Sequence, residues 1–361
     1  MDRPEAPALP RNRFLSVFTV MALLFALAAC GGDAEPEDGD DEGVTTTAGG
    51  AEDGGECDGY PSENIRLVVP YNPGGAMDLW GRFSQQALEA SLPNDATVIV
   101  DNRPGAGGMI GTTAVYTSDA DGYTIGLVDP AQVKTVELQG NSDIDVNTMR
   151  AIGRLTLAPE IVVVSAASEA ETIEDLQALA AERPLIMSTG GVAAVNIVSF
   201  DALEMPFEAL NHDGSAEALL ALQRGDGDVS VFTLANMIQG IRAGDFRPVL
   251  VIGTRPAEGE PGYEEIGQVP TIDEASGQEG LGGSLEQNRM LWAPPGTPDC
   301  VVDILSEAMV TGVSDPDFLA SVEEAGEFPP SPLNADDAQE IISNISEQLT
   351  QYQELLAQLE E

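Results

Sequence analysis

Residues 68–80, VVPYNPGGAMDLW, decide the fold, because they begin with the apolar run of a β-strand and end with the pattern of an α-helix. Two prolines and the pair Gly74-Gly75 interrupt the transition. Glycines without a Cβ let backbone amides approach a ligand, and the helix N-terminus adds a positive partial charge. The ligand could be a phosphate or a carboxylate, or the stretch could be a plain tight turn. The spacing matches neither GxGxxG nor GxxxxGK(S/T), so a nucleotide fingerprint is absent.

The pattern on either side of this stretch predicts a parallel sheet. Short apolar runs at Ile65–Pro70, Thr97–Val100 and Tyr123–Val128 predict strands, and Met77–Ser91 and Gly108–Ser118 between them predict helices. An alternation of strand and helix places parallel strands in one sheet with helices on its faces.

The alternation continues through the middle of the chain, and about 300 folded residues are more than one core usually serves. Further strands are predicted at Ile161–Val164, Leu185–Met187, Phe207–Leu210, Val229–Phe232 and Val249–Ile252, and helices at Ile173–Ala181, Val192–Leu203, Ser215–Gln223 and Leu234–Ala243. A late strand, Arg289–Ala293, precedes helices near Pro298–Thr311, Asp315–Glu324 and Ala335–Leu356. We expect these late elements to return to the first lobe. The predicted fold is α/β with two lobes, a hinge and a cleft, with residues 60–157 and 288–361 in lobe one and 158–287 in lobe two.

Four more strand ends carry residues suited to a ligand, since ligands of open α/β sheets bind beyond the carboxyl ends of strands. They are Asn102–Gly108, Ser188–Ala193, Asn211–Ser215 and Thr233–Asn236. The hydroxyls and glycines of Ser188-Thr189-Gly190-Gly191 suit a carboxylate, because charge-assisted hydrogen bonds need no basic side chain. His212, the only histidine, could line the cleft or could simply be packed. Asp78 could contact a ligand or cap the helix.

The first 30 residues predict a secretory signal peptide. Arg11 and Arg13 precede an uncharged run, Phe14–Ala29, which is short for a membrane span. The sequence LAACG at 27–31 predicts cleavage before Cys30 and lipidation of that cysteine; a simple signal peptide and an uncleaved anchor are the alternatives. Each of the three places the remaining chain outside the cytoplasmic membrane. Residues 31–59, rich in Gly, Asp, Glu and Thr, predict a disordered acidic tether.

Composition excludes several functions. With 15 Lys and Arg against 61 Asp and Glu, the net charge of −46 repels polyanions, so no nucleic-acid partner is expected. No paired carboxylates, metal-ligand spacing or nucleophile with a base are evident, so neither an enzyme nor a cofactor is predicted. Cys57 and Cys300 could form a disulfide outside the cell or remain two thiols.

Several segments together resemble the substrate-binding receptors of tripartite tricarboxylate transporters, the Bug-type family. They include YPSENIRLVVPYNPGGAMD, DNRPGAGGMIGTTAVYTSDADGYTIGL and LWAPPGTP, and the match is collinear from Tyr60 to about Gly326. The resemblance implies a monomeric Venus-flytrap receptor that captures a small carboxylate and delivers it to two integral-membrane subunits. A ligand-sensing receptor that partners a membrane kinase remains the alternative.

Motif by motif, the resemblance and the strand ends give one set of candidate ligand contacts. They are Tyr71, Asn72, Gly74, Gly75, Ala76, Asp78, Asp129, Ser188, Thr189, Gly190, Gly191, Val192, Ala193, His212 and Thr233. Three departures from the family pattern stand out. The second-lobe loop, STGGVAAVN, is shorter; His212 replaces a tyrosine; and Phe232-Thr233 replaces an Asp-Asn pair. Loss of that aspartate favours an anionic or aromatic ligand over an amino acid.

Overall fold

The computed structural model describes residues 57–191, 193–212 and 214–357, which all belong to one compact unit. The predicted signal peptide, Cys30, the predicted tether up to residue 56 and Val192 lie outside the described residues. Within the described ranges, no helix combines the length and the apolar character that a membrane span requires.

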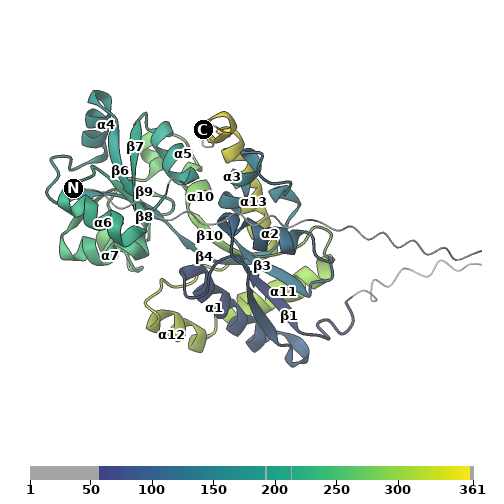
Figure 1. The fold of residues 1–361 in the computed structure, drawn as a ribbon. Helices are drawn as coiled ribbons and strands as arrows, with labels where there is room; N and C mark the ends of the chain where they lie inside the picture. Colours follow the sequence, from purple (N-terminus) through teal and green to yellow (C-terminus); the bar gives the residue numbers. More distant parts are fainter. Residues whose placement is uncertain (1–56, 192, 213, 358–361) are drawn as a thin grey trace, which may run out of the picture. The chain divides into compact units, whose positions relative to one another are not determined.

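The first lobe is built on a five-stranded sheet in the order β2-β1-β3-β10-β4 (Figure 1). Its strands are β1 (Ile65–Val69), β2 (Val98–Asn102), β3 (Thr124–Val128), β4 (Arg150–Ala158) and β10 (Gln287–Ala293). As predicted, β1 to β3 are parallel, with Leu67 opposite Val100 on one side and Ile125 on the other. Strands β10 and β4 run antiparallel to their neighbours, and β4 was not predicted.

Helices cover both faces of this sheet. They are α1 (Ala76–Ser91), α2 (Met109–Tyr116), α3 (Pro130–Leu138), α11 (Asp299–Val313), α12 (Pro316–Glu324) and α13 (Ala335–Thr350), with 3-10 turns at Pro93–Asp95, Ala106–Gly108 and Val146–Thr148. The short α14 (Gln353–Leu356) follows, and its Leu356 lies in the core of the second lobe. The face of α1, α11 and α12 buries Trp80, Leu88 and Leu305, and the face of α2, α3 and α13 buries Val133 and Ile342.

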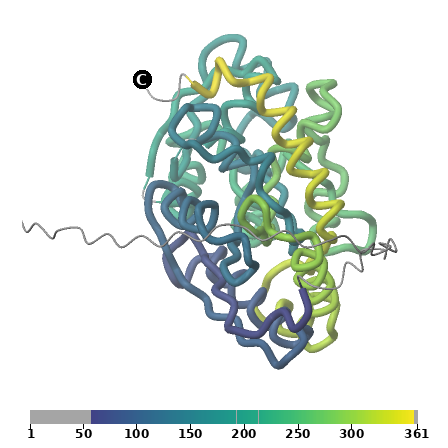
Figure 2. Tube along the Cα trace, turned by 90° about the vertical axis from the view of Figure 1, so that its right-hand side faces the viewer, coloured from purple at the N-terminus to yellow at the C-terminus, as the bar shows by residue number. Residues whose placement is uncertain are grey.

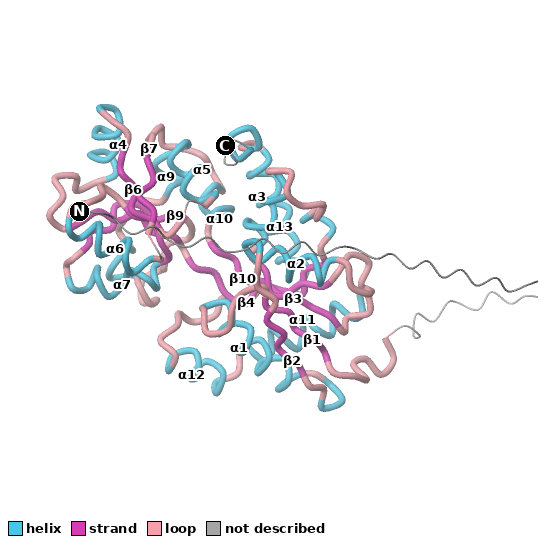
Figure 3. Tube along the Cα trace, in the orientation of Figure 1, coloured by secondary structure: helices cyan, strands magenta, loops and turns pink. Residues whose placement is uncertain are grey.

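The second lobe contains two small sheets (Figure 3). Strands β5 (Glu160–Ser165), β8 (Ser230–Thr233) and β9 (Phe246–Ile252) form an antiparallel sheet in the order β8-β5-β9, and β6 (Leu185–Thr189) pairs in parallel with β7 (Phe207–Asn211). A single parallel bridge from Met187 to Val229 joins the two sheets. The helices are α4 (Ile173–Glu182), α5 (Ala194–Ala202), α6 (Ser215–Arg224), α7 (Leu234–Ala243), α8 (Tyr263–Ile266), α9 (Ile272–Ser276) and α10 (Leu281–Leu285).

Two chain crossings connect the lobes. Only Pro159 separates the end of β4 in the first sheet from the start of β5 in the second, and the chain returns through Glu286 into β10. We propose lobe boundaries at these crossings, near residues 158 and 287.

The prediction placed the late helices in the first lobe, but α13 packs against both lobes. Ile342 lies in a first-lobe core, whereas Ile345 and Leu349 lie in the core that contains Val162 and Leu185 of the second lobe. Figure 2 shows this helix, in yellow, running from the region of the purple strands toward the teal and green segments. The physical reason is the position of the apolar residues, since Ile342 faces a core of the first lobe while Ile345 and Leu349, further along the same helix, face the core of the second.

A disulfide joins Cys57 to Cys300 at the start of α11, with their Cα atoms 6.2 Å apart. Residues 57–59, which the prediction assigned to the tether, form a turn in which the Tyr60 amide donates to the Cys57 carbonyl at 3.1 Å. The described part of the chain therefore begins at the disulfide.

Candidate functional site

The first glycine junction, between β1 and α1, is shaped by Asp78. The Asp78 carboxylate is 4% exposed and accepts the Gly74 amide at 2.9 Å and the Asn102 side-chain amide at 2.9 Å. It also pairs with Arg82 at 3.1 Å. Gly74 needs its lack of a side chain, because its φ of +89° lies in the left-handed region. Protein donors thus occupy the carboxylate, and we interpret Asp78 as a residue that positions the loop.

Gln132, which the sequence analysis did not single out, brings three junctions together. The Tyr71 hydroxyl donates to the Gln132 side-chain carbonyl, and the Gln132 side-chain amide donates to the Gly107 carbonyl. Asp129, one of the predicted contacts, caps the same helix by accepting the Ala131 amide at 3.1 Å. The ends of β1, β2 and β3 therefore converge on the first turn of α3.

In the second lobe, Ser188 and His212 form one hydrogen-bonded unit. Ser188 is fully buried, its hydroxyl donates to the Ala218 carbonyl at 2.9 Å, and it lies 2.9 Å from His212 Nε2. Since the hydroxyl proton is already donated, Nε2 serves as the donor to Ser188 Oγ. Ser188 was predicted to contact the ligand directly; here it holds the half-buried His212 ring in place.

The rest of that loop is held by hydrogen bonds between its backbone and the side chains of Thr189 and Asn196. The Thr189 hydroxyl donates to the Gly191 carbonyl at 2.7 Å, and the Ala193 amide donates to the Asn196 side chain at 2.7 Å. A Cβ on Gly190 would lie 3.1 Å from Gly214, so this glycine allows two neighbouring loops to approach. The exposed positions of the loop, Gly190, Gly191 and Ala193, are the ones that can meet a ligand.

The remaining candidates lie at helix starts. Asn72, Gly75 and Ala76 are exposed in the loop that leads into α1, and Gly75 occupies its N-cap position. Thr233 is 8% exposed and occupies the N-cap position of α7.

One cavity of about 370 Å³ brings candidates from both lobes together. Asp129 and Gln132 line it from the first lobe, and Glu160 and Ala193 line it from the second. The loop from Tyr71 to Asp78 is not part of the lining and is linked to the cavity through the bond from Tyr71 to Gln132.

Three ionisable side chains interact at the crossing between the lobes, the carboxyl groups of Asp129 and Glu160 and the guanidinium of Arg289. Burial, and to a smaller extent the charge of Asp129, raise the pKa of Glu160 to about 8. Burial also raises the pKa of Asp129 to about 7, although backbone amides and Arg289 oppose this shift. Burial lowers the pKa of Arg289, against the opposing effect of Glu327, Asp129 and Glu160. A charged residue at the edge of an apolar run, as in PEIVVV, is the signal that could have identified Glu160.

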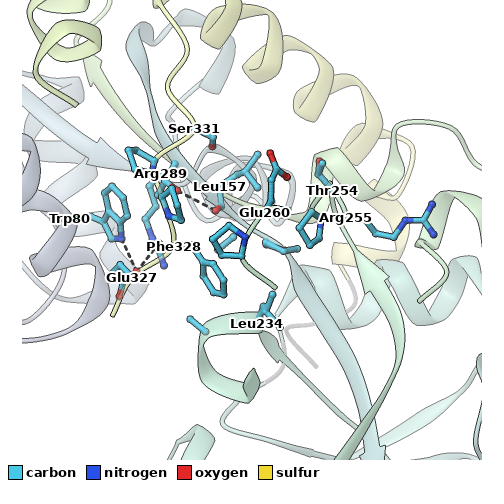
Figure 4. A pocket seen from close by; sticks show the side chains of 18 residues that line it. Trp80, Leu157, Leu234, Thr254, Arg255, Glu260, Arg289, Glu327, Phe328 and Ser331 are labelled. Atoms are coloured by element: carbon cyan, nitrogen blue, oxygen red, sulfur yellow. Dashed lines mark hydrogen bonds and ion pairs between the residues drawn. The ribbon is translucent and has the colours of Figure 1, made fainter. Parts of the chain in front are cut away.

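A second cavity, of about 290 Å³, lies on the other flank of the crossing (Figure 4). Trp80 of α1, Leu157 of β4, Leu234 of α7 and Phe328 line it, with Arg289 at one side. No group of three or more His, Cys, Asp or Glu side chains is placed to hold a metal ion in the part of the chain that the structure describes.

The chain is similar to known proteins over most of its length. The family model described as "Tripartite tricarboxylate transporter family receptor" matches residues 82–360. A Bordetella pertussis protein of the group UPF0065 is 28% identical over 292 residues, covering 78% of this chain and 85% of the relative. A Pseudomonas sp. protein of the same group is 30% identical over 290 residues, covering 74% and 79%.

Solved structures share the architecture. A TctC solute-binding protein from Polaromonas superposes with a TM-score of 0.68 at 23% identity, covering 83% of this chain and 100% of that chain. The periplasmic binding protein BugD gives 0.60 at 26% identity, covering 83% and 98%. MatC from Rhodopseudomonas palustris, solved with bound malate, gives 0.59 at 18% identity, covering 82% and 100%. The two-lobe α/β fold predicted from the sequence is confirmed.

Proposed function

The chain belongs to the family of tripartite tricarboxylate transporter receptors, and we propose that it is a lipid-anchored receptor for a small di- or tricarboxylate or an aromatic acid. Membership places it among extracytoplasmic solute-binding proteins that work with integral-membrane transporter subunits. In the proposal, lipidation at Cys30 holds the receptor at the membrane. The ligand lies between the loop Tyr71–Asp78 of the first lobe and the loop Ser188–Ala193 of the second.

The observation that carries this proposal is the absence of side-chain caps on three helices at the strand ends. Helices α1, α5 and α7 begin at Gly75, Ala193 and Thr233, and among the described residues no N-cap side chain accepts from their first-turn amides. At α5 the Asn196 side chain accepts only the N-cap amide of Ala193, and at α7 the Leu234 amide donates to the Pro159 carbonyl at 3.1 Å. By contrast, Thr172 caps α4 and Asn334 caps α13. Uncapped first-turn amides leave donors and a positive partial charge for an anion.

Helices from both lobes share this property, which suits a ligand with more than one carboxylate. One carboxylate can meet the start of α1 while another meets the start of α5 or α7. The MatC structure holds malate, a dicarboxylate. Charge-assisted hydrogen bonds of this kind contribute about 1.5–3 kcal/mol each, enough to offset a repulsive surface charge.

A thermal-shift screen with mono-, di- and tricarboxylates tests the proposal. A ligand at 100 times its Kd stabilises the native state by about 2.7 kcal/mol, which raises the unfolding temperature measurably. We expect Gly75→Val to abolish that rise. The φ of Gly75 is −88° and an added Cβ would come no closer than 3.9 Å to other atoms, so the fold tolerates the change.

Gly283→Val is the matched control, because a Cβ at Gly283 of α10 meets nothing within 4 Å and the residue lies outside the candidate loops. It should respond to ligand like the unmodified protein. If no carboxylate raises the unfolding temperature, or if Gly75→Val responds normally, the proposed site is incorrect.

A further inference from the structure

The cavity of about 370 Å³ between the lobes carries carboxyl groups from both of them. Asp129 of the first lobe and Glu160 of the second line it, and among the described residues of its lining none is a lysine, an arginine or a histidine. The charge of Asp129 contributes to the raised pKa of Glu160, so the two groups repel each other when both are ionised. A lining of this kind favours a positively charged group of a ligand.

The protein leaves these carboxyl groups without a cation in direct contact. In the part of the chain that the structure describes, neither forms an ion pair; Arg289 pairs with Glu327, at 3.9 Å, and lines the cavity on the other flank of the crossing. Glu160 is 5% exposed, and of its two carboxylate oxygens only Oε1 accepts a hydrogen bond from a described residue, Gln287, at 3.2 Å. Asp129 is only half-buried, so a group that enters the cavity can reach it. Because a buried carboxylate oxygen without a donor is costly, a donor from a ligand is favoured here.

The start of α5 gives the same cavity a wall of opposite polarity. Ala193, Ala194 and Val195 line it. The Ala193 amide donates to Asn196, whereas the amides of Ala194 and Val195 meet no acceptor among the described residues. Two free amides at the positive end of this nine-residue helix attract a carboxylate.

A wall that favours an ammonium group and a wall that favours a carboxylate match the two charged groups of an α-amino acid. We propose that the ligand is an α-amino dicarboxylate. Its ammonium group lies against Asp129, with Glu160 behind, and its α-carboxylate accepts from the first-turn amides of α5. The inference rests on the proposed function, in which the second carboxylate meets the start of α1.

One departure from the family pattern bears on this ligand class. Replacement of an Asp-Asn pair by Phe232-Thr233 removes one partner for an ammonium group. Asp129, after β3, and Glu160, at the start of β5, supply carboxyl groups from a different part of the chain. The replacement therefore does not exclude an amino acid.

The test is calorimetric titration of the full chain at pH 8 with three matched pairs of acids. Succinate and L-aspartate, glutarate and L-glutamate, and adipate and L-2-aminoadipate differ within each pair only by the ammonium group. In at least one pair the amino acid should bind at least 10-fold more tightly, because the carboxyl groups attract the ammonium group alone. The 2-hydroxy acid of the same length, which has a donor without the charge, should bind less tightly than the amino acid.

The outcomes separate this inference from the proposed function. If the plain acid or the hydroxy acid binds as tightly as the amino acid in every series that binds, the inference is wrong and the receptor function stands. The same conclusion follows if a tricarboxylate binds and no member of the three pairs does. If no carboxylate of any kind binds, the proposed function is itself wrong and the inference falls with it.

Variants locate the ammonium group. Asp129→Asn removes the charge and keeps an N-cap for α3, since asparagine caps helices as well as aspartate does. It should reduce the preference for the amino acid over the plain acid at least 10-fold, without loss of affinity for the plain acid. A purely structural role of Asp129 would weaken both acids alike. Glu160→Gln should also reduce the preference, and it tests the site even if Asp129→Asn fails to fold.

Asp315→Asn is the matched control. Asp315 likewise caps a helix that begins with a proline, α12, and it does not line the cavity. This variant should show the same preference as the unmodified protein. Full retention of the preference in both Asp129→Asn and Glu160→Gln would overturn the inference.

Discussion

At the scale of single residues, three ionisable side chains at the crossing between the lobes shift one another's pKa values: those of Asp129, Glu160 and Arg289. Glu160 opens β5 and is 5% exposed, and Gln287 of β10 donates to it at 3.2 Å. Two carboxyl groups of raised pKa, the buried Glu160 and the half-buried Asp129, lie beside the buried guanidinium of Arg289, so that each charge depends on the others.

This group predicts a pH dependence of stability. The pKa of Glu160 is about 8 in the folded chain and near its ordinary value of about 4.3 in the unfolded chain. The folded state then holds a proton that the unfolded state releases, so the free energy of unfolding should fall as pH rises from about 4 to 8. The slope for one proton is about 1.4 kcal/mol per pH unit. Urea unfolding at pH 5, 6, 7 and 8 and constant ionic strength measures it.

Glu160→Gln removes the titrating group while keeping its size, so its stability should fall less steeply with pH than that of the unmodified protein. Glu264→Gln, which changes an exposed glutamate, is the control and should follow the unmodified protein. Identical slopes for Glu160→Gln and the unmodified protein would show that Glu160 does not carry this proton.

At the scale of elements, α1 and α11 pack so closely that one glycine sets their separation. A Cβ on Gly312 of α11 would lie 2.1 Å from the carbonyl oxygen of Ala87 on α1. That atom belongs to the backbone and cannot rotate away, so the two helices must move apart to admit a methyl group.

Gly312→Ala should therefore destabilise the protein by about 1–3 kcal/mol, the usual cost of overpacking a core, despite the better helix propensity of alanine. Gly283→Ala in α10 has open space around its Cβ and should be neutral or slightly stabilising. Denaturant unfolding of both variants measures the difference. Equal stability of the two would mean that the helices are not in the contact described.

Elements with a strong local pattern could be predicted from the sequence, and those that depend on distant partners could not. The β1–α1 junction was predicted because the apolar pattern of a strand, a pair of glycines and the pattern of an amphipathic helix follow one another directly in the sequence. Strand β4 was missed because Arg150 and Arg154 interrupt its apolar pattern, and its partner β10 lies more than 100 residues away. Gln132 was missed for the same reason, since it contacts Tyr71 61 residues earlier in the chain.

At the scale of the whole molecule, the net charge of −46 opposes capture of an anion. The repulsion acts at long range, whereas helix amides act at contact distance. Raising ionic strength from about 0.1 M to 1 M shortens the Debye length from about 10 Å to about 3 Å. This weakens the long-range repulsion more than the attraction of the helix amides for the bound carboxylate.

We therefore predict that the affinity for a carboxylate holds or rises between low and molar salt, mainly through a faster association rate. Stopped-flow measurement of association and dissociation at several salt concentrations checks this. A steep loss of affinity with salt would indicate that basic side chains, and not backbone dipoles, bind the ligand.

The disulfide between Cys57 and Cys300 has a mechanical consequence. Any tension on the chain that precedes Cys57 enters the protein at a residue covalently attached to the start of α11. The load is thus shared with α11, which packs on α1 and β4, and is not carried by β1 alone. A receptor pulled from its N-terminus would keep its first strand, and with it the glycine loop that follows, in register.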